Sequence, residues 1–193
     1  MQTIFRFPPL AAAAILLAAC VAPEVLVSKS AEVPVGVDFS GRWQLRDDGG
    51  ETIRRLDNAN PVQVEDIIKE AKRTRTGRQR NSRPGSAVHV FLEAGTNLKI
   101  TQTDYGIFVS FDRSIVEEYQ FGENRQVNVG PIVAMRVSGW EGNAYVIETL
   151  DGDGAKLVEW YRLEDSASKL VRSITLWEKG VQKLSVEQVF ERN

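Results

Sequence analysis

Few side chains in this sequence could do covalent or metal chemistry. The chain of 193 residues has one cysteine, Cys20, and one histidine, His89, which excludes most zinc sites, thiol–histidine pairs and disulfide frameworks. His89 stands among apolar residues in a predicted strand over residues 88–93, where a lone histidine is more often packed or exposed than catalytic. We therefore expect neither a metal nor another cofactor.

Acidic residues give no better candidate for catalysis. Glu117 and Glu118 are adjacent in a predicted strand, so their side chains point to opposite faces and cannot act together as acid and base. Asp151 and Asp153 lie in a glycine-rich hairpin and are too few for calcium, which takes about six to eight oxygen ligands. They favour a turn. Because the sequence also lacks nucleophile-elbow, phosphate-loop and dinucleotide motifs, we predict that the chain is not an enzyme.

Aromatic side chains are better candidates for a binding site. Four of them fall in predicted strands: Tyr119, Tyr145, Trp160 and Tyr161. In a small β-barrel such residues can line a cavity for an apolar or amphipathic ligand. The alternative is that they fill a packed core together with Trp43, Trp140 and Trp177. An interior cavity of about 300 Å³ or more favours the ligand.

Short runs rich in β-branched and aromatic residues follow Ser86 and are separated by turn residues. The predicted strands cover residues 88–93, 98–103, 107–111, 116–121, 133–138, 144–150, 156–163, 170–177 and 181–190. Glycine-bearing connections such as residues 151–154 and 178–180 predict hairpins between antiparallel neighbours. A meander of this length leaves two exposed edges unless it closes. Closure with the strand around Trp43 predicts a mainly-β, up-and-down barrel of about eight to ten strands.

A helix and a basic loop are predicted between Trp43 and this meander. Val64, Ile67 and Ile68 recur at helical spacing and predict a helix over residues 61–75. Residues 72–85 contain none of the large apolar side chains and predict a loop. Seven Lys/Arg and one acid occur in residues 69–83. The cations of the loop are Lys72, Arg73, Arg75, Arg78, Arg80 and Arg83.

Two interpretations of the basic loop remain open. It is either a solvated loop without a partner or a contact with anionic lipid, lipopolysaccharide or cell-wall carboxylates. Each Lys/Arg near an anionic surface contributes about 1 kcal/mol. The chain as a whole has 24 Lys+Arg against 26 Asp+Glu, so the remainder is acidic and nucleic acid is not expected as a partner.

The N-terminal residues have the sequence pattern of a signal peptide. Arg6 precedes the apolar run 10–19, which has about half the length that a helix needs to cross a bilayer. The run ends in Leu17-Ala18-Ala19-Cys20, which resembles the lipobox of bacterial lipoproteins; the alternative is an ordinary secretory signal with an incidental cysteine. The resemblance implies removal of residues 1–19 and lasting membrane attachment through acylated Cys20. Val21 in place of an aspartate implies the outer membrane, with the domain facing the periplasm or the cell surface.

A flexible tether over residues 20–37 is predicted from its prolines and lack of periodicity, followed by a barrel domain over residues 38–193. The domain opens with Phe39-Ser40-Gly41-Arg42-Trp43-Gln44-Leu45, in which Gly41-x-Trp43 resembles the first motif of the lipocalins. The resemblance implies a lipocalin-like or looser calycin-like barrel closed at one end by Gly41 and Trp43. It also implies a structural arginine stacked on Trp43, for which Arg172 and Arg192 are the candidates.

These features together predict a lipid-anchored protein of the cell envelope. Its barrel is expected to bind a small apolar or amphipathic ligand. The alternative is an envelope scaffold with a filled barrel that acts through its basic loop.

Overall fold

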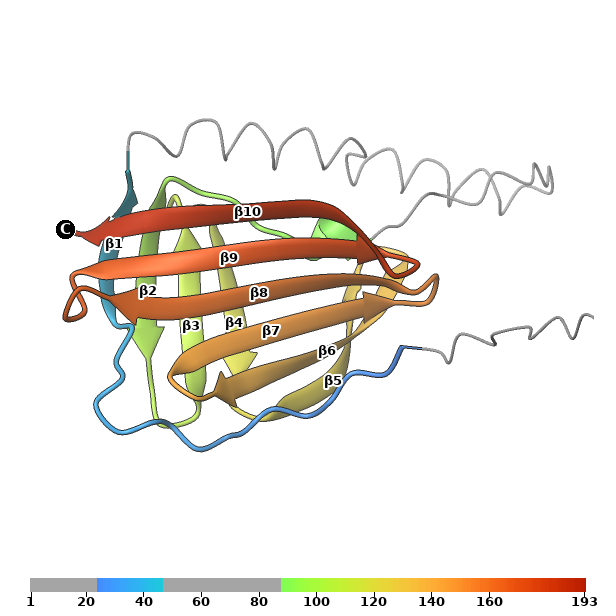
Figure 1. The fold of residues 1–193 in the computed structure, drawn as a ribbon, viewed down its shortest axis with the longest axis horizontal. Helices are drawn as coiled ribbons and strands as arrows, with labels where there is room; N and C mark the ends of the chain where they lie inside the picture. The colour runs from blue at the N-terminus through green and yellow to red at the C-terminus, as the bar shows by residue number, and fades with distance from the viewer. Residues whose placement is uncertain (1–23, 47–87) are drawn as a thin grey trace, which may run out of the picture.

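The computed structural model describes residues 24–46 and 88–193. Within them, ten antiparallel strands form one sheet in the order β4-β3-β2-β1-β10-β9-β8-β7-β6-β5. The strands are β1 (Gly41–Leu45), β2 (Asn97–Gln102), β3 (Gly106–Phe111), β4 (Ile115–Gln120), β5 (Glu123–Val129), β6 (Ile132–Glu141), β7 (Ala144–Asp151), β8 (Ala155–Glu164), β9 (Lys169–Glu178) and β10 (Val181–Arg192). In Figure 1 the long strands β6–β10 lie side by side and β1–β4 cross behind them. The sheet is a nearly closed barrel, which confirms the predicted mainly-β, up-and-down architecture.

Several predictions fall outside the described residues. These are the signal peptide 1–19, Cys20, the helix 61–75 and the basic loop 72–85. In the part of the chain that is described, no helix has the length and apolar character needed to cross a membrane.

Two strand predictions were wrong. Residues 88–93 were expected to form a strand, but Val88–Phe91 is a short 3-10 helix, η2, with all four side chains buried. A short apolar run does not distinguish these structures when every side chain is buried. β5 was missed because it is mostly polar; among its residues only Glu123 and Val127 are buried, and it is the last strand of the sheet.

Residues 24–37 lie along the barrel, which differs from the predicted flexible tether. The backbones of Ser30 and Trp140 exchange hydrogen bonds of 3.3 and 2.8 Å. Lys29 Nζ donates to Glu148 Oε1 at 3.0 Å on the outer face of β7. This close approach requires Gly139, which has φ +157°, because a Cβ there would lie 2.4 Å from the Ser30 carbonyl oxygen.

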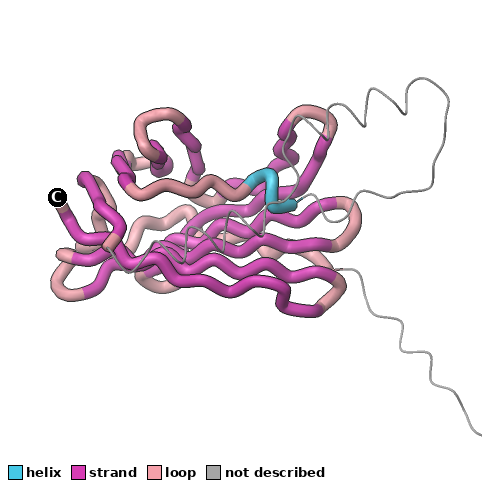
Figure 2. Tube along the Cα trace, turned by 90° about the horizontal axis from the view of Figure 1, so that it is seen from above, coloured by secondary structure: helices cyan, strands magenta, loops and turns pink. Residues whose placement is uncertain are grey.

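Two apolar clusters fill the interior. The aromatic cluster includes Trp43, Phe111, Tyr145, Tyr161 and Phe190. The aliphatic cluster includes Val88, Leu157, Ile174 and Val186, with Phe91 beside them. Figure 2 shows η2 set over the long strands, where it contacts β7 and β8. On β8, β9 and β10 one cluster occupies one end of the strand and the other cluster the other end.

Candidate functional site

A belt of buried polar side chains separates the two apolar clusters. On β8, β9 and β10 the belt residue is the inward-facing residue between the two clusters, and inward-facing residues of β6 and β7 continue the belt. All five side chains are at most 4% exposed: Arg136, Thr149, Glu159, Arg172 and Gln188. We call this set the polar belt. Burial of charged groups is costly unless they are paired and hydrogen-bonded, so the partners of the two arginines decide what the belt can do.

Arg172 is fully engaged within the belt. Its Nε donates to Glu159 Oε2 at 3.0 Å, and its Nη1 donates to Gln188 Oε1 at 3.2 Å. The guanidinium also lies 5.1 Å from the centre of the Phe111 ring and 5.5 Å from that of Tyr161. Burial opposes its charge, but Tyr161 and Glu159 beside it raise the pKa of Arg172. It therefore holds strands together as a charged pair with Glu159.

Arg136 is only partly engaged. Its Nε donates to Thr149 Oγ1 at 3.3 Å, and its Nη1 lies 3.6 Å from Glu117 Oε2. The guanidinium packs against the rings of Phe91 and Tyr119, at 5.8 and 5.2 Å from their centres. Its two terminal nitrogens make no hydrogen bond with any described residue.

The guanidinium of Arg136 lines a pocket of about 210 Å³ at the gap between β4 and β5. These strands end the sheet order and do not pair with each other. Glu117 of β4, Phe91 of η2, Glu93 and residues 125–129 of β5 complete the wall. The pocket is smaller than the roughly 300–1,000 Å³ of typical small-molecule sites. It therefore does not reach the volume that would favour a ligand over a filled barrel on size alone. It suits the polar end and a short apolar part of a ligand.

Glu93 has an acidic neighbour in this pocket. Burial raises the pKa of Glu93 above its ordinary value, and repulsion from Glu117 and Glu159 adds to the effect, while Arg172 opposes it. The Glu93 carboxylate therefore takes up a proton at a higher pH than an exposed glutamate does.

Replacing Glu93 by glutamine is expected to stabilise the protein modestly at neutral pH and to leave stability unchanged in acid. Because the folded-state pKa lies above the ordinary 4.5, the folded protein binds more protons than the unfolded chain in the interval between them, so stability falls as pH rises through it. Thermal unfolding midpoints of both proteins, followed from about pH 3.5 to 7, measure this. An equal gain at both ends would show that the effect is not titration of Glu93.

Of the four aromatic candidates from the sequence, the three tyrosines belong to the aromatic cluster and Trp160 lies apart from them. Tyr119, Tyr145 and Tyr161 are at most 1% exposed and face the interior. Burial raises the pKa of each of them. Trp160 is half-buried on the outer face, because it is next to inward-facing Tyr161 in β8 and successive side chains alternate. Trp177 is placed outward in the same way. Of the four, Tyr119 is the one whose ring packs against Arg136, which lines the pocket.

Trp43 and Gly41 lie at the aromatic end of the barrel. Trp43 is 1% exposed, and its Nε1 donates to the Phe39 carbonyl oxygen at 3.0 Å. Arg192, rather than Arg172, stacks on it, with the guanidinium carbon 4.3 Å from the ring centre. Gly41 has φ +151°, and a Cβ there would lie 2.8 Å from Arg192 Nη1. Glycine therefore leaves room for this stack.

The acidic residues considered above as catalytic or metal-binding candidates do not form such a site. The Asp151 carboxylate accepts backbone hydrogen bonds from Asp153 and Ala155 at 3.0 and 2.9 Å, as expected for a turn. Glu117 faces the pocket and Glu118 is exposed. Nowhere in residues 24–46 and 88–193 do three His, Cys, Asp or Glu side chains gather as a metal site would require.

Comparison with known protein families and with curated proteins found no match. Solved structures with a similar barrel include a secretory abundant heat soluble protein from Ramazzottius varieornatus, with 11% identity, coverage of 84% of this chain and 100% of that one, and a TM-score of 0.47. Apo lipid binding protein 8 of Caenorhabditis elegans has 12% identity, 83% and 99% coverage and a TM-score of 0.48. A mutant of the fluorescent protein UnaG has 16% identity, 80% and 96% coverage and a TM-score of 0.42.

Proposed function

We propose that this chain is a ligand-binding barrel that takes a small amphipathic molecule through the gap between β4 and β5. The polar end of the ligand lies against Arg136, and its apolar part lies along Phe91 and Val127. The observation that carries the proposal is the buried side chain of Arg136, which lines an open pocket. Apart from the 3.6 Å ion-pair contact of Nη1 with Glu117, its terminal nitrogens have no partner among the described residues. A ligand carboxylate can accept two hydrogen bonds from such a group.

A filled scaffold, the alternative, is supported by the packing of Tyr119, Tyr145 and Tyr161 in the interior. It does not account for Arg136. A buried ion pair is often no more stabilising than apolar side chains of the same volume. Stability alone therefore does not explain why a buried arginine with few hydrogen bonds lies beside Glu93 and Glu117. The ligand interpretation gives its terminal nitrogens the close hydrogen-bond acceptors that Glu117, at 3.6 Å, does not provide.

Octanoate, a carboxylate on a short alkyl chain, is the probe that tests the ligand site. In a titration followed by amide NMR shifts, we expect a saturable change confined to η2, β5 and the strand positions around Glu117 and Arg136. Octylammonium, which has the same chain and the opposite charge, should bind more weakly. Tighter binding of octylammonium would assign the polar end to Glu93 and Glu117 instead, and scattered shifts without saturation would contradict the site.

A lipid anchor on Cys20 is the second part of the proposal, supported by the lipobox-like Leu17-Ala18-Ala19-Cys20. Mass spectrometry of membrane-extracted protein is expected to find an N-terminal peptide that begins at acylated Cys20. Cys20→Ser should move the protein out of the membrane fraction or leave it unprocessed. An unmodified Cys20 in the processed chain would contradict the anchor and leave the ligand site untouched.

A further inference from the structure

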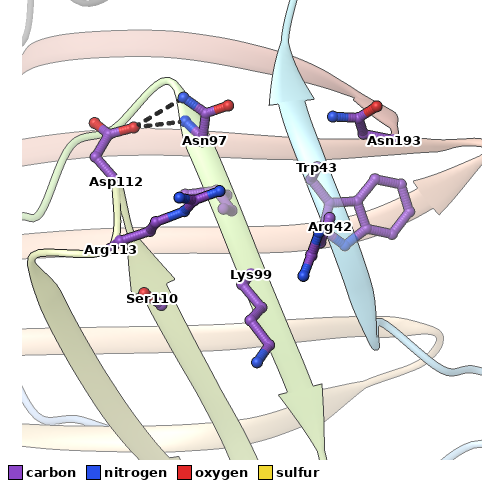
Figure 3. A pocket seen from close by; sticks show the side chains of 9 residues that line it. Arg42, Trp43, Asn97, Lys99, Ser110, Asp112, Arg113 and Asn193 are labelled. Atoms are coloured by element: carbon purple, nitrogen blue, oxygen red, sulfur yellow. Dashed lines mark hydrogen bonds between the residues drawn. The ribbon is translucent and has the colours of Figure 1, made fainter.

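The outer face of β1, β2 and β3 carries a second pocket, of about 520 Å³, that no step above uses (Figure 3). Three cations line it: Arg42 from β1, Lys99 from β2 and Arg113 from the turn between β3 and β4. In Figure 3 their side chains stand around the hollow with the Ser110 hydroxyl group beside them. All three cations are exposed to solvent.

The three cations line the same pocket, and two of them are paired across strands. Arg42 and Lys99 are direct cross-strand partners in the β1–β2 register, and like charges in that position are destabilising. No carboxylate among the described residues forms an ion pair with Arg42, Lys99 or Arg113. Ser110 is the β3 partner of Lys99, and its hydroxyl group adds a neutral hydrogen-bond donor next to the cations.

Asp112 is the acidic side chain among the residues that line this pocket, and its carboxylate accepts hydrogen bonds within the hairpin turn. One of its oxygens accepts from the backbone N–H of Asn97 at 2.8 Å and of Thr96 at 3.1 Å. Burial opposes the charge, but these hydrogen bonds lower the pKa of Asp112. Its carboxylate therefore holds the β3–β4 turn to the start of β2 and leaves the three cations available.

We propose that this outer pocket binds a small soluble molecule that carries phosphate groups. A phosphate group has a charge of about −2 and three acceptor oxygens, which suits two arginine forks and one lysine better than a single carboxylate does. The volume holds more than one such group. The site lies on the opposite face of the sheet from the pocket of Arg136 and is independent of it.

Pyrophosphate is the probe, titrated into the full-length chain in a non-ionic detergent and followed by calorimetry and amide NMR. The variants are Lys99→Gln and Arg113→Gly; the latter suits its position, because Arg113 has φ +62° and glycine adopts that conformation without strain. Lys183→Gln, which removes an exposed charge on β10, is the matched control. Each pocket variant should weaken binding about tenfold, the control should match the parent, and added salt should weaken binding in all of them.

Shifts are expected at the residues around Lys99, Ser110 and Arg113. Equal affinity in the parent and in both folded pocket variants would overturn the proposal, as would shifts located elsewhere. Vesicles of phosphatidic acid in phosphatidylcholine distinguish the other source of phosphate. Vesicle binding that depends on Lys99 without any binding of pyrophosphate would overturn a soluble ligand in favour of a lipid headgroup.

Discussion

Replacing Trp43 by alanine is expected to lower the free energy of unfolding by about 3–5 kcal/mol. The side chain is 1% exposed and belongs to the aromatic cluster. Its loss leaves a cavity and removes both the hydrogen bond to the Phe39 carbonyl and the surface on which Arg192 stacks. Urea unfolding followed by circular dichroism measures the change.

Trp160→Ala is the matched control for this experiment. It removes the same side chain from the outer face of β8, where the tryptophan is half-buried, so the loss of stability should be clearly smaller. If Trp43→Ala left stability unchanged and abolished octanoate binding instead, Trp43 would belong to the ligand site and its structural role would be wrong.

Removing the acid of the buried ion pair is the other change with a large expected effect. Glu159→Leu leaves Arg172 buried and without its charged partner, which is expected to cost about 3–5 kcal/mol. The double variant Glu159→Leu/Arg172→Met should recover most of this loss, because it replaces both charges by apolar groups of similar volume. Thermal and urea unfolding of both proteins provide the comparison.

An ion pair on the outer face gives the control. Arg162 Nη2 lies 2.9 Å from Glu187 Oε2, but the two side chains are 37% and 53% exposed, so Glu187→Leu should change stability by less than about 1 kcal/mol. A double variant no more stable than Glu159→Leu would show that the polar belt does not act through charge.

The barrel is predictable from the sequence because its physical basis is local. Sets such as Ile107, Val109 and Phe111 alternate along a strand with period two, and glycine-bearing turns separate the strands. β5 has no such signal: most of its residues are polar, and only three-dimensional pairing with β6 identifies it. The gap between β4 and β5 cannot be predicted from the sequence either, because the absence of pairing between two strands has no sequence pattern of its own.

The candidate site was predictable in part. Alternation alone places Glu117 on the inward face with Tyr119, and Arg136 on the inward face with Ala134 and Ser138. A charged residue at an inward position is therefore a usable signal. By the same alternation Trp160 and Tyr161 cannot both face the interior, so the sequence alone shows that these two residues cannot line one cavity together. That Arg172 meets Glu159 while Arg136 meets an open pocket depends on packing between distant strands.

Octanoate affinity in the parent and in Arg136→Met tests the ligand-binding barrel most directly. Methionine keeps much of the arginine volume and removes its donors. Arg162→Met, on the outer face, removes the same charge away from the pocket and is the control. We predict one octanoate bound per chain, an affinity at least about tenfold weaker in folded Arg136→Met, and no change in the control. Equal affinity in all three proteins, or no saturable binding to the parent, would contradict the account.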